Sequence, residues 1–212
     1  MKDEFELMSE GKLYNSSEPS LVAKRIKARE LAMDFNNLRP SELDKKRAVL
    51  SALFNKTDNI ESAYFEPNIR VEYGSNVKFG KNFYMNYDCM LLDVAKIIIG
   101  DNVMFGPRVI LATPMHPFLA EERIMQDYPN GFYNIEYAKP IKIGNNVWIA
   151  SNVTICGGVT IGDNTVIASG AVVTKDIPSN VLAGGIPCKI IRQLNEDDRL
   201  NVWETYCKNK NK

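Results

Sequence analysis

The single histidine of the chain, His116, is the residue best suited to acid–base chemistry. It lies in the run TPMHP, where a proline on either side restricts the backbone. An imidazole exchanges a proton near neutral pH, so a histidine held in place can serve as a general base. A single histidine tells against a three-histidine zinc site. The sequence therefore favours metal-free proton transfer at His116, with a purely structural histidine as the alternative.

Two other groups of side chains could bind a ligand. Tyr84 and Asn86, in the run KNFYMNYD, offer a phenol and an amide that can bind a polyol or a carbonyl oxygen. Asn86 could equally be a turn residue. Lys175, Lys189 and Arg192 bring positive charge that suits a ligand with phosphates or a pyrophosphate, although ordinary solvated surface is an equal alternative.

The cysteines suggest a further, weaker alternative. Four cysteines lie far apart without a Cys-x-x-Cys pair, so neither a disulfide framework nor a zinc knuckle is indicated. A covalent acyl-enzyme at Cys89 or Cys156 would need a base to activate the sulfur, and no second histidine is present. Reduced, partly buried thiols are the simpler interpretation.

A six-residue repeat must position these side chains. Between residues 143 and 177 an apolar β-branched residue recurs at every sixth position, at Ile143, Ile149, Ile155, Ile161, Ile167 and Val173. A rougher version of the same spacing begins near residue 73 and continues to residue 111. This period suits a coil of three short strands, each with one inward side chain, and small second-position residues suit the turns. The repeat predicts a mainly β protein built on a parallel β-helix.

The repeat is interrupted once, and the interruption begins beside His116. Residues 113–142 lose the period and are rich in proline, tyrosine and charge, which predicts an excursion from the coil. Long irregular segments inside compact domains more often carry function than not. We therefore expect the excursion to form part of the site.

Helices are expected before and after the coil. Patterns over 2–12 and 19–37, with Pro19 in a first turn, and a third helix capped by Ser41 predict a cap over one open end of the coil. A final helix should pack Leu200, Trp203 and Tyr206 on the coil. The expected organisation is a helical cap at 1–58, a β-helix at 59–193, and a C-terminal helix with a basic tail at 194–212.

Charge balance limits the expected partners. Lys plus Arg and Asp plus Glu are both 26, so no net field favours nucleic acid or an anionic membrane over a small molecule. The first residues lack the continuous apolar core of a signal peptide, which predicts a cytoplasmic protein.

Several runs together resemble a known family. They are GKLYN, YGSN, NFYMNYD, IGDNV, MHP, IGNNVWIASNVTI, VTIGDN, VVTKDIPSNV and GIPCKIIR. In this order they resemble the maltose and galactoside O-acetyltransferases of the hexapeptide-repeat family. The resemblance implies a left-handed β-helix, a homotrimer with the site between neighbouring subunits, and acetyl-coenzyme A as the acetyl donor, with no metal.

The resemblance also implies roles for individual residues. His116 matches the catalytic base and Asn86 lines the same site. Tyr84 and Asp93 fall near the acceptor pocket. The positions that match donor-binding residues are Asn86, Ser151, Ser169, Thr174, Lys175, Lys189 and Arg192.

One position departs from the family pattern. Family members often carry a sugar-binding aspartate just after the Leu-Tyr pair, whereas residues 13–18 of this chain are LYNSSE. Glu18 could substitute for that aspartate, or Asn15 or Ser16 could hydrogen-bond a hydroxyl without charge.

The sequence-based hypothesis is an O-acetyltransferase in which His116 deprotonates a sugar hydroxyl as it attacks the thioester. Backbone or Asn86 donors would stabilise the oxyanion. The alternatives are acetylation of an antibiotic or another amine or alcohol, and a β-helix scaffold without enzyme activity.

Overall fold

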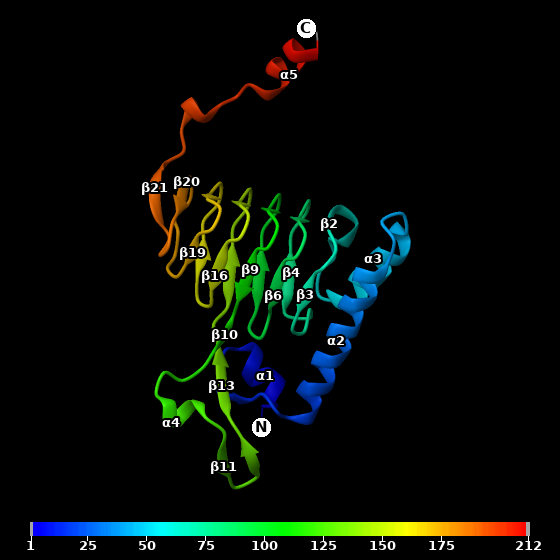
Figure 1. Cartoon of the computed structure of the whole chain (residues 1–212), viewed down its shortest axis with the longest axis vertical. Helices are drawn as coiled ribbons and strands as arrows, with labels where there is room; N and C mark the ends of the chain where they lie inside the picture. The colour runs from blue at the N-terminus through cyan, green and yellow to red at the C-terminus, as the bar shows by residue number, and fades with distance from the viewer. Residues whose placement is uncertain (1, 211–212) are drawn as a thin grey trace.

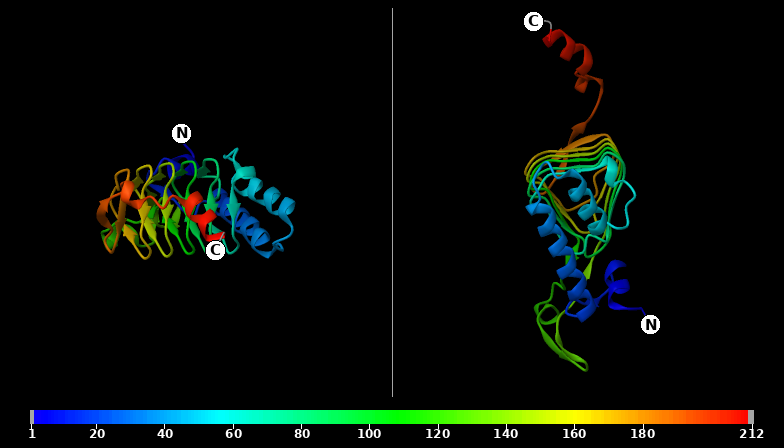
Figure 2. Two further views of the ribbon diagram at one scale, coloured as in Figure 1. Left: turned by 90° about the horizontal axis from the view of Figure 1, so that it is seen from above. Right: turned by 90° about the vertical axis from the view of Figure 1, so that its right-hand side faces the viewer.

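The computed structural model describes residues 2–210, and most of them wind into a parallel β-helix with a triangular cross-section (Figures 1 and 2). Three sheets form its walls, and we name them by their outward side chains. The lysine sheet contains β4 (Val77–Phe79), β7 (Ile97–Ile99), β14 (Ile141–Ile143) and β17 (Thr160–Ile161). The aromatic sheet contains β2 (Tyr64–Phe65), β5 (Tyr84–Met85), β8 (Met104–Phe105), β15 (Trp148–Ile149), β18 (Val166–Ile167), β20 (Val181–Gly184) and β21 (Lys189–Gln193). The aliphatic sheet contains β3 (Arg70–Val71), β6 (Met90–Leu92), β9 (Ile110–Ala112), β16 (Thr154–Cys156) and β19 (Val172–Val173).

The hexapeptide pattern explains the core. The side chains at its first positions, from Ile143 to Val173, are all buried inside the coil, and their strand neighbours point outward. Each coil hydrogen-bonds to the next through parallel pairing, as between Ile149 and Ile167. The predicted parallel β-helix with N-terminal helices is therefore confirmed.

The three corners of the coil differ in their residues. We call the turn between the lysine and aromatic sheets the ladder corner, because asparagines at positive φ stack there. Their side-chain amides hydrogen-bond in one row, Asn82 to Asn102, Asn146, Asn164 and Asn180, at 2.9–3.0 Å. The Asn86 corner joins the aromatic and aliphatic sheets, and the His116 corner joins the aliphatic and lysine sheets.

Helices close the N-terminal end of the coil (Figure 1). They are α2 (Pro19–Asn37) and α3 (Leu43–Leu53), followed by η1 (Ile60–Ser62), whereas the preceding α1 (Glu4–Ser9) lies to one side of the coil. Proline begins α2 as predicted, but Ser41 does not cap α3: the N-cap is Glu42, and its side chain makes no capping bond. The ring of Phe54 lies 5.3 Å from Phe65, so α3 ends in an aromatic plug over the first coil.

The excursion is more regular than predicted. It contains β10 (Pro114–Met115), α4 (Ala120–Arg123), β11 (Gln126–Tyr128), β12 (Gly131–Tyr133) and β13 (Ile135–Ala138). Strand β13 lies between β10 and β1 (Tyr14–Asn15), antiparallel to both. The excursion is thus joined by backbone pairing to the N-terminal segment.

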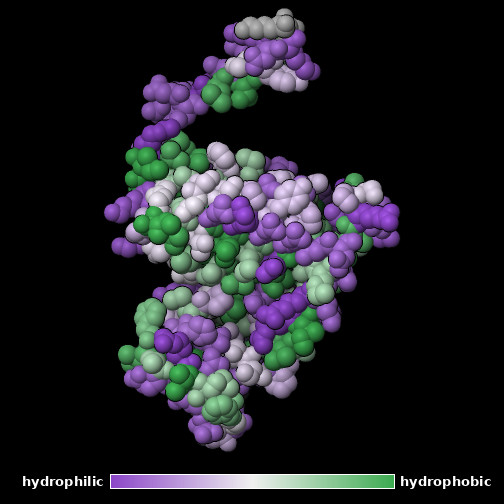
Figure 3. All heavy atoms as spheres, viewed as in Figure 1, coloured by the Kyte–Doolittle hydropathy of each residue, from purple (hydrophilic) through white to green (hydrophobic). Residues whose placement is uncertain are grey.

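The C-terminal prediction was wrong in one respect. After β21 and η2 (Glu196–Asp198), helix α5 (Val202–Lys210) stands away from the coil (Figures 1 and 3). Leu200 and Trp203 are 74% and 72% exposed, and Tyr206 is exposed too, so they do not pack on it. The extended segment before α5 carries the helix outward. Residues 211–212 of the predicted tail lie outside the described residues.

No helix within residues 2–210 is long and apolar enough to cross a membrane.

Candidate active site

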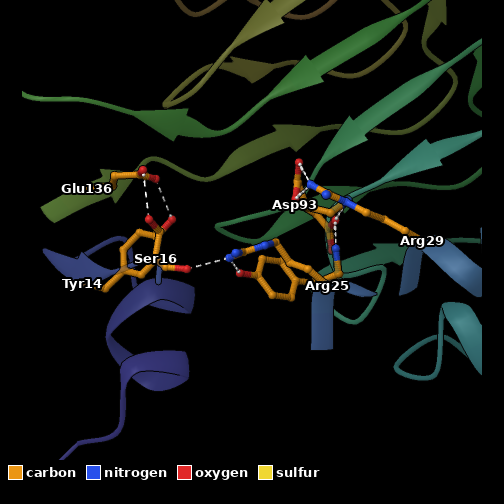
Figure 4. Close-up of polar contacts among 8 residues, drawn as sticks. Tyr14, Ser16, Arg25, Arg29, Asp93 and Glu136 are labelled. Atoms are coloured by element: carbon orange, nitrogen blue, oxygen red, sulfur yellow. Dashed lines mark hydrogen bonds and ion pairs between the residues drawn. The ribbon is translucent and has the colours of Figure 1, made fainter. Parts of the chain in front are cut away.

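The small sheet β1–β13–β10 brings together residues that lie about 120 positions apart. Strand β1 pairs Tyr14 with Glu136 of β13, and β10 leads directly into His116. The Ser16 hydroxyl donates to Oε1 of Glu136 at 3.0 Å. Ser16 and His116, two of the predicted site residues, therefore lie at one carboxylate, and Figure 4 shows the contact between Ser16 and Glu136.

Glu136 is the centre of this group. Its carboxylate accepts hydrogen bonds from the Tyr14 hydroxyl at 3.2 Å and from Asn134 Nδ2 at 2.9 Å. Nδ1 of His116 lies 3.9 Å from Oε1, close enough for an ion pair once the imidazole is protonated. The side chain of Glu136 is only 16% exposed, whereas His116 is 49% exposed. The Nδ1 edge of the imidazole thus lies near a carboxylate, and about half of the side chain is accessible to solvent.

Burial, with the nearby charge of Glu136, raises the pKa of Tyr14 well above its ordinary value. The phenol therefore stays protonated and keeps donating to the carboxylate.

A pocket of about 290 Å³ opens next to Glu136. Its lining residues are Tyr14, Ser16, Arg25, Arg29, Glu72, Tyr73, Val94, Pro114 and Glu136. Nη1 of Arg25 donates to the backbone carbonyl of Ser16 at 2.9 Å and to the Tyr73 hydroxyl at 3.0 Å. Arg29 pairs with Glu72 at 2.8 Å. The wall is rich in hydroxyl, guanidinium and carboxylate groups, which suits a ligand with several hydroxyls.

Two of the predicted acceptor residues have structural roles instead. Glu18 is the N-cap of α2, where its carboxylate accepts from the backbone amides of Ser20 and Leu21. Asp93 is 0% exposed and its carboxylate accepts only backbone amides. Neither carboxylate lines the pocket next to Glu136.

The other predicted site residues divide between two corners. Asn86 lies at the Asn86 corner, and the parallel register brings Ser151 and Ser169 to the same corner, each one position after the alanine that aligns with Asn86. Thr174 and Lys175 follow β19 at the His116 corner. The full width of the aliphatic sheet separates these corners within one chain (Figure 2). A single chain therefore does not bring Asn86 to His116.

Tyr84 lies on the outer surface of the aromatic sheet, stacked on Tyr64 with ring centroids 5.9 Å apart. It is thus remote from the His116 corner.

The last two predicted cations lie on β21, at the C-terminal end of the coil. Lys189 is exposed opposite Gly184. Arg192 pairs with Asp198, Nη1 to Oδ2 at 2.8 Å. Its charge is therefore partly neutralised within the chain.

The thiol alternative has little structural support. Cys89 is buried, and burial raises the pKa of its thiol to about 11. Little thiolate would form near neutrality. In the part of the chain that the structure describes, no cluster of three or more His, Cys, Asp or Glu side chains could hold a metal ion.

The sequence did not identify Glu136, Tyr14 or Arg25. Glu136 lies in a segment without the hexapeptide period, and its partners Tyr14 and Ser16 are about 120 residues away. The only local signal was the short run IEYA of β13, with Ile and Tyr as strand-favouring residues, just before the coil resumes. No local pattern links that run to the N-terminal segment.

Two family models match the chain. The maltose acetyltransferase hexapeptide capping motif covers residues 7–58, and the bacterial transferase hexapeptide model, with six repeats, covers residues 140–175. The first match is the N-terminal helical region, and the second is the regular part of the coil.

Three relatives cover nearly the whole chain. Galactoside O-acetyltransferase from Escherichia coli is 41% identical over 92% of each chain. The crystal structure of a maltose O-acetyltransferase from Clostridium difficile superimposes with a TM-score of 0.83 at 44% identity, over 92% of this chain and 99% of that one. A galactoside acetyltransferase in complex with coenzyme A has a TM-score of 0.83 at 40% identity, over 93% and 94%.

Proposed function

Because the chain belongs to the maltose and galactoside O-acetyltransferase family, it is an acetyl-CoA-dependent acyltransferase, and we propose that its acceptor is a sugar hydroxyl. The observation that carries this proposal is the pocket beside His116. Its wall carries hydroxyl, guanidinium and carboxylate groups, and one of these carboxylates, Glu136, lies 3.9 Å from Nδ1 of the half-exposed His116. Such a wall matches the alternating donors and acceptors of a sugar.

His116 acts as the general base in this proposal. Its Nε2 takes the proton of the acceptor hydroxyl while that oxygen attacks the thioester carbonyl. The carbon–sulfur bond then breaks, and the coenzyme A sulfur leaves and takes up the proton that His116 holds. Glu136, beside Nδ1, stabilises the imidazolium that forms in between. No covalent acyl-enzyme is required.

The carboxylate of Glu136 also replaces the missing aspartate of the N-terminal segment. Ser16 stands close to that position and donates its hydrogen bond to Glu136. The pocket thus keeps a carboxylate, but it comes from β13.

A complete site requires a second subunit. Asn86, Ser151 and Ser169 share one corner, and His116, Thr174 and Lys175 share another, so we propose that these corners meet between neighbouring copies in a homotrimer. The outward side chains support this arrangement. Tyr64, Met104 and Trp148 are about half exposed on the aromatic sheet, whereas the lysine sheet exposes Lys78 and Lys142. An apolar wall suits burial against a partner, and a charged wall suits water.

The donor would lie between these corners and reach the C-terminal coils. Ser151 and Ser169 would contact its pantetheine arm. Lys175, Lys189 and Arg192 would attract its phosphates, and of the three only Arg192 holds a carboxylate, that of Asp198, among the described residues.

The proposed acceptor class is tested by the release of free thiol from acetyl-CoA in the presence of different acceptors. We expect turnover with maltose, glucose or methyl β-D-galactoside that depends on both substrates. Amine acceptors such as aminoglycosides serve as the comparison. Turnover of amines with none of the sugars would reject a sugar acceptor while leaving the acetyltransferase chemistry in place.

The shared site is tested by mixing subunits. Asn86→Ala and His116→Ala chains, each weakly active alone, should regain activity when co-expressed, because some interfaces then pair an intact His116 corner with an intact Asn86 corner. Random assembly of a cyclic trimer at equal expression restores about one quarter of the sites. Light scattering should report three chains. Activity of the mixture no greater than the average of the two variants would place the whole site in one chain.

A further inference from the structure

Asp93 is a buried carboxylate with only backbone partners. Its Oδ1 accepts from the amides of Glu72 at 3.1 Å and Tyr73 at 2.9 Å, and its Oδ2 accepts from the amide of Asn76 at 3.2 Å. The side chain is 0% exposed, and burial raises its pKa to about 6. Near neutral pH the group is therefore mainly a carboxylate, taken out of water at a free-energy cost that hydrogen bonds must offset.

Asn76 holds the same turn from the other side. Its Nδ2 donates to the backbone carbonyls of Asp93 at 2.9 Å and Val94 at 3.1 Å. Asn76 is itself 3% exposed. The two side chains thus form a reciprocal clasp between the 72–76 turn of one coil and the 93–94 corner of the next.

The clasped turn is also fixed against the helical cap. Gly74 has a φ of +67°, and a Cβ there would come within 2.5 Å of the Leu53 carbonyl oxygen at the end of α3. Any other residue would strain this contact. The 72–76 turn therefore has little freedom on either side.

The residues that the clasp holds line the pocket. Glu72 and Tyr73, whose amides Asp93 holds, both turn their side chains into the pocket wall, and Val94 lines it as well. Tyr73 receives a hydrogen bond from Arg25, and Glu72 pairs with Arg29. Figure 4 shows Asp93 near the guanidinium group of Arg29, with Arg25 between them and Glu136. The orientation of both guanidinium groups thus depends on the turn that Asp93 holds.

We infer that Asp93, with Asn76, is a positioning residue for the acceptor: it touches no ligand and fixes the Tyr73–Arg25 and Glu72–Arg29 pairs that recognise one. The inference rests on the proposed function, because it takes this pocket to be the acceptor site. A purely structural carboxylate would support the coil as a whole and affect both substrates alike. A positioning carboxylate affects the acceptor selectively.

The experiment compares Asp93→Asn with wild type for the KM of the acceptor, the KM of acetyl-CoA, and kcat. An asparagine has the same shape, but its Nδ2 cannot accept the amide that Oδ2 accepts. We expect the acceptor KM to rise about tenfold, the effect of about 1.4 kcal/mol of lost orientation, with the acetyl-CoA KM within about twofold. An unchanged acceptor KM, or equal changes in both KM values, would overturn the inference.

A double-mutant cycle tests whether Asp93 acts through Tyr73. Tyr73→Phe removes the hydroxyl that Arg25 contacts. If Asp93 works by placing that hydroxyl, Tyr73→Phe should raise the acceptor KM much less in the Asp93→Asn background than in wild type. If the two substitutions raised the acceptor KM independently, so that their fold-changes multiplied in the double variant, Asp93 would not act through Tyr73 and the inference would be contradicted.

A second variant and an exchange measurement test the inference even if Asp93→Asn does not fold or no acceptor is turned over. Should Asp93→Asn fail to fold, Asn76→Ala removes the other half of the clasp and must show the same selective rise in acceptor KM. Hydrogen exchange at the amides of residues 72, 73 and 76 reads the clasp without any acceptor: faster exchange confined to this turn supports it, and uniform acceleration contradicts it. If wild type turns over no sugar, the proposed acceptor class fails, and the exchange data still decide the clasp.

Discussion

His116→Ala lowers kcat by about 10²–10⁴-fold, the usual contribution of a positioned general base. The imidazole is the only one in the chain, and the other titratable group beside it, Glu136, is bound to Tyr14, Ser16 and Asn134. No second side chain is therefore placed to take over the proton. Steady-state kinetics with a sugar acceptor measures the effect, and the KM for acetyl-CoA should hardly change.

Chemical rescue provides the control. Added imidazole should restore part of the turnover of His116→Ala, because a small base can enter a site whose histidine is half exposed. The same addition should not stimulate wild type. Wild-type turnover in His116→Ala, measured with a good acceptor, would mean that another group is the base.

Glu136→Gln should have the second largest effect, a loss of about 10–10²-fold in kcat. The amide keeps the shape of the carboxylate but cannot stabilise an imidazolium at Nδ1 of His116. It also presents an NH₂ group to Tyr14, Ser16 and Asn134, which now donate to the carboxylate. Turnover should fall, and the acceptor KM should rise because Ser16 and Tyr14 lose their common partner.

Glu72→Gln is the matched control for this prediction. Glu72 lines the same pocket, but it pairs with Arg29 and not with His116. We expect Glu72→Gln to change the acceptor KM and leave kcat near wild type. Equal losses of kcat in the two variants would show that Glu136 has no special relation to the base.

The repeating part of the fold was predictable because the same local pattern of buried and exposed residues recurs in every coil. A buried β-branched residue at every sixth position, from Ile143 onward, specifies stacked parallel strands without any long-range information. The beginning of α2 at Pro19 follows from local chemistry in the same way. His116 stood out as the one imidazole at the start of an interruption, and in the structure it lies 3.9 Å from Glu136, which lines the pocket.

The remaining parts depend on contacts between distant segments. Glu136 could be identified as a site residue only from the pairing of β13 with β1. Asp93 could be identified as part of the clasp only from the positions of the amides of residues 72–76. Glu18 looked like a ligand because it follows the family's sugar-binding position, yet a local bond to the start of α2 holds it. Apolar spacing in α5 indicated a packed helix but could not show what, if anything, it packs on.

The asparagine row at the ladder corner has a consequence for how this molecule could diversify. Neighbouring members of the row are 16 to 20 residues apart, except for Asn102 and Asn146, which are 44 apart and still joined at 3.0 Å. The asparagine row is therefore continuous across the excursion, and the coils before and after it stack directly on each other. Substitutions in β10 and β13, which supply Pro114 and Glu136 to the pocket, can therefore change its wall while the stacked asparagines of the coil stay as they are. The scaffold and the recognition segment are thus free to evolve at different rates.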